Sequence, residues 1–230
     1  MKKTIGITGA SGFLGQHLLS FFSALAGTIK IIPFLGDVRK QKQVESFVKK
    51  CDLVIHLAAK GSTYLAEEIL ETNIGGTLNV INACYSHKKG FLTCVERNLT
   101  EDVFSVSKRL QKSFVNQFNK LGFQGFVMKL DTVLGGREYK FQAKRPICNN
   151  ADQVLELLTP EDVCKWIYSF SDAFLTNGSF YVKEFEFWDP IRITVKDLKS
   201  LLRGDILKDV KPEHARKILK CNEKAGSINV

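Results

Sequence analysis

Three glycines at a spacing of three residues offer the clearest chemistry in this sequence. Gly9, Gly12 and Gly15 lie in GITGASGFLG, directly after a short apolar run and before a stretch with helical periodicity. Gly9 allows a sharp turn, Gly12 leaves room for a phosphate to approach the backbone, and Gly15 lets a helix pack close to a sheet. The amide groups from Ser11 to Leu14 would then face that phosphate at the helix start. Placed between a strand and an amphipathic helix, the pattern predicts a dinucleotide-binding loop.

Side chains that could transfer a proton lie further along the chain. Tyr64 and Glu96 each follow a predicted strand, so both would lie at the edge of the sheet where the glycine loop ends. Lys108 begins one face of a later helix. These residues also have ordinary interpretations, as a packed loop aromatic, a solvated charge and a surface lysine. His56 lies within an apolar strand, and we expect its ring to be satisfied inside the fold. We therefore keep Tyr64, Glu96 and Lys108 as candidate catalytic residues.

The elements that would position these residues follow from apolar runs and periodicity. Continuous hydrophobic residues in DLVIHLAA are typical of a parallel sheet that is covered on both faces. Strands are predicted at 4–8, 28–34, 52–59, 91–95 and 125–130, and helices at 12–26, 43–50, 66–87 and 101–121. This alternation predicts an α/β fold with a Rossmann-like, doubly wound parallel sheet.

The pattern changes after Gly135 and Gly136. The remaining sequence predicts a short strand at 154–159, a helix that starts at Pro160, a strand at 179–187, a helix capped by Thr194 and a further helix at 213–220. We therefore divide the chain into a Rossmann domain at 1–135 and, at 136–230, a small α+β substrate-binding lobe with a polar tail.

Charge limits the classes of partner. The formal net charge is +9, from 33 Lys and Arg residues against 24 Asp and Glu residues. This excess suits either an anionic ligand such as a nucleotide or a lysine-rich solvated surface. The basic residues are scattered and no RNA-binding signature accompanies them, so we do not expect a nucleic-acid partner.

Cysteine spacing and the N-terminal residues bear on location. None of the six cysteines forms a C-x-x-C pair, so we expect no metal site and free thiols in a reducing cytosol. Thr8 and Gly9 interrupt the first apolar run too early for the core of a signal peptide. No stretch approaches the length that spans a bilayer. We expect a cytoplasmic protein without a membrane segment.

Several motifs together resemble one family. TGASGFLG resembles the nucleotide loop of the extended short-chain dehydrogenase/reductases, the group of nucleotide-sugar epimerases, dehydratases and reductases. Further stretches agree with the family in the same order, namely GDVRK at 36–40, CDLVIHLAA at 51–59, ETNIGGTLNVINAC at 71–84 and KLDTVLGG at 129–136. The resemblance covers roughly residues 4–202, and the glycine loop and HLAA are its most specific parts.

The resemblance implies a set of cofactor-binding residues. In chain order these are Gly9, Ser11, Gly12, Phe13, Leu14, Gly15, Asp37, Val38, Leu57, Ala58, Ala59, Asn73 and Lys108. The first six would hold the pyrophosphate, the next two would flank the adenine, and the next three would lie along the riboses. The last two would reach the ribose nearest the nicotinamide or organise the structure around it.

The segment that would distinguish NAD from NADP is short. Only residues 27–35 separate the first helix from GDVR, where the family usually has two strands and a helix. An acidic residue that would read a ribose 2′-hydroxyl is missing unless Asp37 takes that role. Arg39 could instead meet a 2′-phosphate or point to solvent. The cofactor is thus NADP or NAD, and we favour NADP.

The catalytic positions also depart from the family. A tyrosine phenol four residues before the lysine would act as the general acid and base, with its pKa lowered by the ammonium charge. In EDVFSVSK that position holds Phe104, which has no hydroxyl. The strand at 91–95 runs directly into Glu96, so the family's serine or threonine is absent as well. The loss of a proton-transfer group lowers turnover by roughly 10²–10⁴-fold.

Two functions follow from this combination. The first is an atypical or much-reduced NAD(P)-dependent oxidoreductase or epimerase that acts on a nucleotide sugar in polysaccharide biosynthesis. The second is a non-catalytic relative that binds a dinucleotide or a partner enzyme and regulates it. The helices at 66–87 and 101–121 resemble elements that form a dimer interface in the family, so the chain could form a homodimer.

Overall fold

The structure is a computed structural model. It describes residues 2–25, 29–97, 100–133, 152–180, 182–186, 190–202 and 211–218. The chain forms two compact units. The first contains Met1–Lys129 and Trp166–Glu186, and the second contains Leu130–Lys165 and Phe187–Val230. The domain boundary predicted at 135 lies in 134–151, outside the described residues.

The first unit is built on a six-stranded sheet in the order β2-β1-β3-β4-β5-β8. Its strands are β1 (Lys3–Thr8), β2 (Ile29–Pro33), β3 (Leu53–His56), β4 (Gly90–Glu96), β5 (Gly125–Leu130) and β8 (Glu184–Glu186). β1 pairs in parallel with β2 on one side and with β3 on the other. The predicted doubly wound parallel sheet is confirmed. Because the chain reverses its direction of winding at β1, the carboxyl ends of β1 and β3 form a topological switch point.

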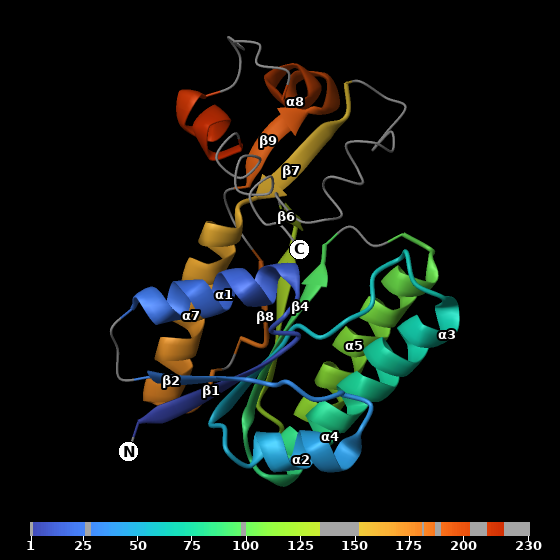
Figure 1. The fold of residues 1–230 in the computed structure, drawn as a ribbon, viewed down its shortest axis with the longest axis vertical. Coiled ribbons are helices and arrows are strands. Elements are labelled where there is room, and N and C mark those ends of the chain that lie inside the picture. Colours follow the sequence, from blue (N-terminus) through green and yellow to red (C-terminus); the bar gives the residue numbers. More distant parts are fainter. Residues whose placement is uncertain are drawn as a thin grey trace. The chain divides into compact units, whose positions relative to one another are not determined.

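Helices cover both faces of this sheet (Figure 1). Helix α1 (Phe13–Ala24) and helix α7 (Pro160–Asn177) lie on one face. The other face carries α2 (Gln41–Val48), α4 (Thr77–Ser86) and α5 (Val103–Asn119). The Phe170 ring of α7 lies 4.9 Å from the Phe126 ring of β5, measured between centroids, which fixes that helix on the sheet.

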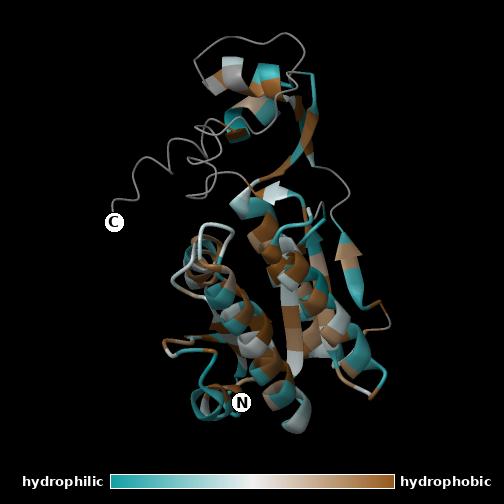
Figure 2. Cartoon of the chain, turned by 90° about the vertical axis from the view of Figure 1, so that its right-hand side faces the viewer, coloured by the Kyte–Doolittle hydropathy of each residue, from teal (hydrophilic) through white to brown (hydrophobic). Residues whose placement is uncertain are grey.

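The core of the first unit reflects the apolar periodicity of the sequence. All four residues of β3 are buried, as a strand covered on both faces requires. Figure 2 shows hydrophilic and hydrophobic residues on the same helices, which is the amphipathic pattern of a surface helix. The core between the sheet and helices α2, α4 and α5 contains buried side chains from both layers. These include Val44, Val48, Val54, Val80, Ile81, Phe91, Val115 and Val127.

The helix predicted at 66–87 has an unpredicted internal change. It begins as α3 (Ala66–Ile69), continues as the π-helix η1 (Leu70–Gly76) and ends as α4. Thr72 and Asn73 are buried within η1. Segments of π-helix are often found at functional sites, because they re-aim side chains without ending the helix.

The second unit has a three-stranded sheet in the order β6-β7-β9. β6 (Thr132–Val133) is parallel to β7 (Val154–Leu158), and β9 (Ile191–Thr194) is antiparallel to β7. The predicted cap of α8 (Val195–Leu202) is confirmed, because the Asp197 amide donates to Thr194 Oγ1 at 3.0 Å. The core of this unit contains Leu157, Ile191, Ile193, Leu198, Leu201 and Ile218.

Three strands differ from the sequence expectation. β6 and β9 were not predicted, because their residues alternate too briefly to stand out. The strand expected at 179–187 is shortened to β8, which pairs in parallel with β5 of the first unit rather than joining the second lobe. Long-range pairing decided these outcomes, and local periodicity does not report it.

Candidate functional site

The glycine loop joins β1 to α1. Gly9 has a φ of 67°, and a Cβ at this position would lie 2.5 Å from the Ala58 amide nitrogen. A Cβ at Gly15 would collide with the carbonyl oxygen of Gly9. Both glycines are therefore required by the fold itself. Gly12 differs, because the nearest atom to an added Cβ is the Gly9 oxygen at 3.1 Å and its backbone has an ordinary φ of −73°. Apart from that oxygen, no neighbouring heavy atom lies within 4 Å of the added Cβ, so a phosphate can approach the backbone at Gly12.

The start of α1 is arranged to receive an anion. Gly12 is the N-cap residue and provides no side-chain hydrogen bond to the first turn. No acidic residue occupies this turn. The first-turn amides of a helix lack acceptors within the helix, and the helix dipole adds partial positive charge there. Residues Ser11 to Leu14 therefore lie where the sequence predicted a pyrophosphate contact.

The segment after β3 lies against this loop. The Leu57 amide donates to the Thr8 carbonyl oxygen at 3.1 Å, and the Ala58 amide donates to Thr8 Oγ1 at 3.3 Å. Leu57, Ala58 and Ala59 thus extend from the carboxyl end of β3 beside Gly9. The structure brings these three predicted residues to the switch point, where ligands bind in open α/β sheets.

The GDVR segment forms a small ion-pair cluster. Arg39 Nη2 lies 2.8 Å from Asp37 Oδ2, and Arg39 Nη1 lies 3.1 Å from Glu71 Oε2 of η1. The Arg39 guanidinium lowers the pKa of Asp37, chiefly through its hydrogen bonds. Val38 between them is buried, and its carbonyl accepts from Asn79 Nδ2 at 3.0 Å. Arg39, which the sequence left open to a 2′-phosphate, is therefore already engaged by two carboxylates.

Asn73 ties the loop after β3 to α5. Its Oδ1 accepts from the Lys60 amide at 2.7 Å, and its Nδ2 donates to the Lys60 carbonyl at 3.0 Å. The same Nδ2 donates to Ser107 Oγ at 2.9 Å, next to Lys108. Ser107 Oγ in turn donates to the Phe104 carbonyl at 2.6 Å. Asn73 therefore has a structural role beside Lys108.

Lys108 is buried, with an exposed fraction of 8%. The interpretation as a surface lysine is thus wrong. Its ammonium donates to Gln111 Oε1 at 3.2 Å and to the Cys94 carbonyl at 3.5 Å. The Phe104 ring centroid lies 5.8 Å from the ammonium, within the range of a cation–π contact. The ring occupies the place of the absent phenol beside the lysine.

Sequence analysis did not identify the polar residues Gln111 and Thr77, behind Lys108, as site residues. Gln111 Nε2 donates to Thr77 Oγ1 at 3.1 Å, and Thr77 Oγ1 lies 2.9 Å from His56 Nε2. His56 Nδ1 lies 2.7 Å from Thr8 Oγ1, so the chain of contacts ends beside the glycine loop. The expectation that His56 is satisfied within the fold is confirmed. The signal that could have identified the others is the presence of a polar residue in an otherwise apolar face.

The His56 ring is neutral. Burial, and secondarily the charge of Lys108, lowers its pKa to about 3. A neutral imidazole can accept at one ring nitrogen and donate at the other, which matches its two threonine neighbours.

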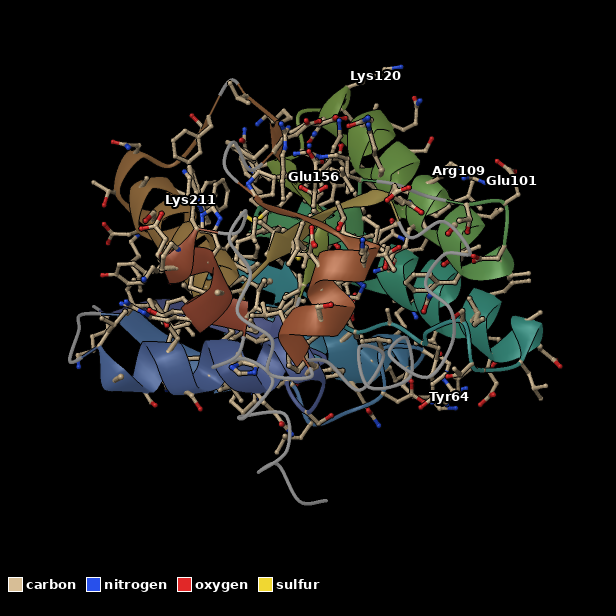
Figure 3. All side chains as sticks on the ribbon, turned by 90° about the horizontal axis from the view of Figure 1, so that it is seen from above. Tyr64, Glu101, Arg109, Lys120, Glu156 and Lys211 are labelled. Carbon is tan, nitrogen blue, oxygen red and sulfur yellow. The ribbon has the colours of Figure 1, made fainter. Side chains whose placement is uncertain are left out.

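The other two catalytic candidates are more exposed than Lys108. Tyr64 is 47% exposed, and the Lys60 ammonium lies 4.0 Å from its ring centroid. Figure 3 shows Tyr64 well separated from Arg109 and Glu101, the ion pair near the start of α5. Glu96 is the exposed last residue of β4. Both remain predicted catalytic residues.

Within the described part of the chain, no group of three His, Cys, Asp or Glu residues is placed to hold a metal ion. Cys148 and Cys221 lie outside the described residues. No helix among the described ranges is long and apolar enough to cross a bilayer.

Comparison with known proteins finds a family match in the N-terminal segment. Residues 5–96 match the family described as NAD dependent epimerase/dehydratase family. A UDP-N-acetyl-alpha-D-glucosaminuronate decarboxylase from Bacillus cytotoxicus is 31% identical over 114 residues, which are 39% of this chain and 35% of that relative. The match thus spans about a third of the curated relative's length. The resemblance indicated by the motifs is confirmed.

Solved structures share the fold. RMD from Pseudomonas aeruginosa complexed with NADPH has a TM-score of 0.74 at 18% identity, covering 99% of this chain and 98% of that one. DesIV, a dTDP-glucose 4,6-dehydratase from Streptomyces venezuelae with NAD and TYD bound, has a TM-score of 0.70 at 15% identity, covering 87% and 80%. At these identities the likeness establishes the Rossmann-like architecture.

Proposed function

From the match of residues 5–96 to the NAD dependent epimerase/dehydratase family, we propose that this protein binds a nicotinamide dinucleotide at the carboxyl ends of β1 and β3. The observation that carries the proposal is the open space above Gly12, which packing does not require. Gly9, Ser11 and the first turn of α1 hold the pyrophosphate, and Ala58 lies along the adjacent ribose. Lys108 donates hydrogen bonds to the ribose nearest the nicotinamide.

The proposed ligand pair is a dinucleotide and a nucleotide sugar. When bound, the nicotinamide supplies hydride transfer. The names of relatives and neighbours support a sugar linked to a nucleoside diphosphate, and we place the protein in polysaccharide biosynthesis in the cytoplasm. UDP-N-acetylated hexosamines are the first compounds to test.

Turnover by the ordinary tyrosine–lysine route is absent in this proposal. The Lys108 ammonium can orient a ligand, but the Phe104 ring that faces it cannot hold or move a proton. General acid–base catalysis by a positioned group contributes roughly 10²–10⁴-fold, and the protein lacks that contribution at this position. We therefore propose a much-reduced or atypical activity.

A second candidate is a non-catalytic relative that binds the dinucleotide and regulates a partner enzyme. The observation that favours it is the exposure of Tyr64, which leaves the most plausible replacement acid outside the buried network around Lys108. This candidate would be excluded if the unaltered protein turned over a substrate and Tyr64→Phe abolished that turnover.

The Arg39 contacts support NAD over NADP, contrary to the preference drawn from the sequence. Asp37 follows the strand next to β1 and lies about 20 residues beyond the glycine motif, where an acid reads the ribose 2′-hydroxyl. A 2′-phosphate would have to displace Asp37 or Glu71 from Arg39.

Exposed apolar residues support a homodimer through the helices after β3 and β4. Leu70 of η1 and Tyr85 of α4 are exposed, as are Val103 and Leu110 of α5. Sedimentation of the protein at several concentrations tests this assembly, and a monomer at every concentration refutes it.

Calorimetric titration with NAD, NADP and ADP tests the binding proposal. Uptake of a dinucleotide at micromolar to millimolar concentration is the expected result, and no uptake of any of the three refutes it.

The substitution Phe104→Tyr tests the catalytic part of the proposal. With a UDP-N-acetylated hexosamine as substrate, we expect turnover to rise by about 10²-fold or more. Chromatography of the sugar nucleotide measures this turnover. Phe104→Leu is the matched control, because it also changes the ring but adds no hydroxyl.

A further inference from the structure

A buried chain of hydrogen bonds connects the strand before the glycine loop to Lys108. It runs from Thr8 through His56 and Thr77 to Gln111, whose Oε1 accepts from the Lys108 ammonium. These five residues come from β1, β3, α4 and α5, and none is more than 8% exposed. Buried polar networks of this kind specify one arrangement of side chains when every member is satisfied.

The chemistry of the chain fixes the orientation of the Gln111 amide. A lysine ammonium has donors and no acceptor, so the atom of Gln111 that faces it must be the carbonyl oxygen. The amide nitrogen then faces Thr77 Oγ1 at 3.1 Å and donates to it. A flipped amide would place its NH₂ group against the ammonium. The ammonium therefore selects this orientation, and the bond to Thr77 Oγ1 stabilises it.

Neutral acceptors contact the ammonium near the end of β4. Gln111 Oε1 lies one helical turn along α5 at 3.2 Å, and the Cys94 carbonyl belongs to β4 at 3.5 Å. A lysine stem has four rotatable carbons and no preferred direction of its own, so such contacts decide where its charge points. The neutral ring of His56 adds no second positive charge to the network.

We propose that Gln111 is a positioning residue, which fixes the Lys108 ammonium for hydrogen bonds to the hydroxyls of the ribose on the nicotinamide side of the dinucleotide. This inference rests on the proposed function of the glycine loop. It assigns to the network a role in ligand recognition that does not depend on the missing tyrosine hydroxyl.

The test compares ADP with ADP-ribose, because only ADP-ribose carries the second ribose. Gln111→Met keeps an unbranched side chain of similar length but removes the acceptor. We expect the Kd for ADP-ribose to rise about tenfold, as for a lost hydrogen bond to a charged group, with the Kd for ADP within about twofold of the unaltered protein. Gln117→Met is the matched control, since Gln117 is an exposed glutamine on the same helix.

Rescue separates positioning from a general effect on packing. Gln111→Glu keeps an oxygen acceptor toward Lys108, so its Kd for ADP-ribose should remain within about threefold of the unaltered protein. If Gln111→Met does not fold, Thr77→Val tests the same link, because it removes the hydroxyl that holds the amide and preserves the shape. Its expected result is again weaker binding of ADP-ribose with ADP binding unchanged.

The outcomes distinguish this inference from the proposed function. ADP-ribose affinity that is the same in Gln111→Met and the unaltered protein overturns the role of Gln111, and the dinucleotide proposal stands. Equal losses for ADP and ADP-ribose overturn it as well, since they indicate disturbed packing. Failure of the unaltered protein to bind either compound overturns both.

Discussion

A glycine loop both folds into a tight turn and binds a phosphate. The substitution Gly12→Ala separates these two roles, because it changes the surface that would contact the phosphate while leaving the fold intact. The added methyl group would meet the Gly9 carbonyl oxygen at 3.1 Å, so the loop needs to shift by only a few tenths of an ångström. The backbone at Gly12 has φ −73° and ψ 169°, a region in which alanine is unstrained. The lower entropy of an unfolded chain with alanine favours folding by about 0.4–1 kcal/mol, and the poorer N-cap opposes folding by a similar amount. We expect the free energy of unfolding to change by about 1 kcal/mol or less.

The effect on binding should be much larger. A phosphate oxygen that accepts from the amides near Gly12 would approach the backbone to about 2.9 Å, and a methyl group in its path would displace it by about 1 Å. One or two charge-assisted hydrogen bonds would then be lost, each of which contributes about 1.5–3 kcal/mol. A loss of about 2–4 kcal/mol corresponds to binding that is about 30- to 700-fold weaker.

The assay is calorimetric titration of ADP into the unaltered protein and into Gly12→Ala, with thermal unfolding of each in the absence of ligand. In the unaltered protein, ADP at 100 times its Kd should raise the free energy of unfolding by about 2.7 kcal/mol, and at the same ADP concentration the increase in the variant should be about 1 kcal/mol or less. Gly15→Ala is the control for a glycine that the fold requires, because its Cβ would collide with the Gly9 carbonyl oxygen. That variant should melt at a clearly lower temperature without ligand.

One result would refute this reasoning. If Gly12→Ala melts like the unaltered protein and still binds ADP with the same Kd, no phosphate lies over Gly12. The open space at this glycine would then have no connection with a ligand, and the dinucleotide proposal would lose its main support.

Two further predictions concern charge. Replacing Glu71 by Gln removes the carboxylate that pairs with Arg39 Nη1. In paired titrations, the affinity for NADP should therefore rise by about fivefold relative to the affinity for NAD. An unchanged ratio of the two affinities would show that Arg39 does not face the 2′ position of the ribose. His56 has a pKa of about 3 in the folded protein and about 6.5 when unfolded, so the unfolded state binds the extra proton between these values. The free energy of unfolding should therefore fall by up to about 1.36 kcal/mol per pH unit as the pH drops from 6.5 toward 5, and urea unfolding of His56→Gln should lack this contribution. Equal pH slopes in the two proteins would contradict the neutral assignment.

The sequence by itself determined the features that depend on local spacing. Gly9, Gly12 and Gly15 are near neighbours in the chain, so their positions between a strand and a helix could be read directly from GITGASGFLG. The same holds for the buried runs of β1 and β3, whose apolar residues need no knowledge of their partners. The replacement of a tyrosine by Phe104 is likewise a statement about identity at one position.

Tertiary structure decided every feature that joins distant residues. Gln111, Thr77 and His56 form one chain of hydrogen bonds although 21 and 34 residues separate the successive partners. Arg39 meets Glu71 across 32 residues, a contact that its isolated position in the sequence did not indicate. Lys108 is buried rather than solvated for the same reason, because its contacts with β4 exist only after the sheet has formed. Periodicity reports which face of an element is apolar, but only the packed fold decides which polar groups on those faces meet.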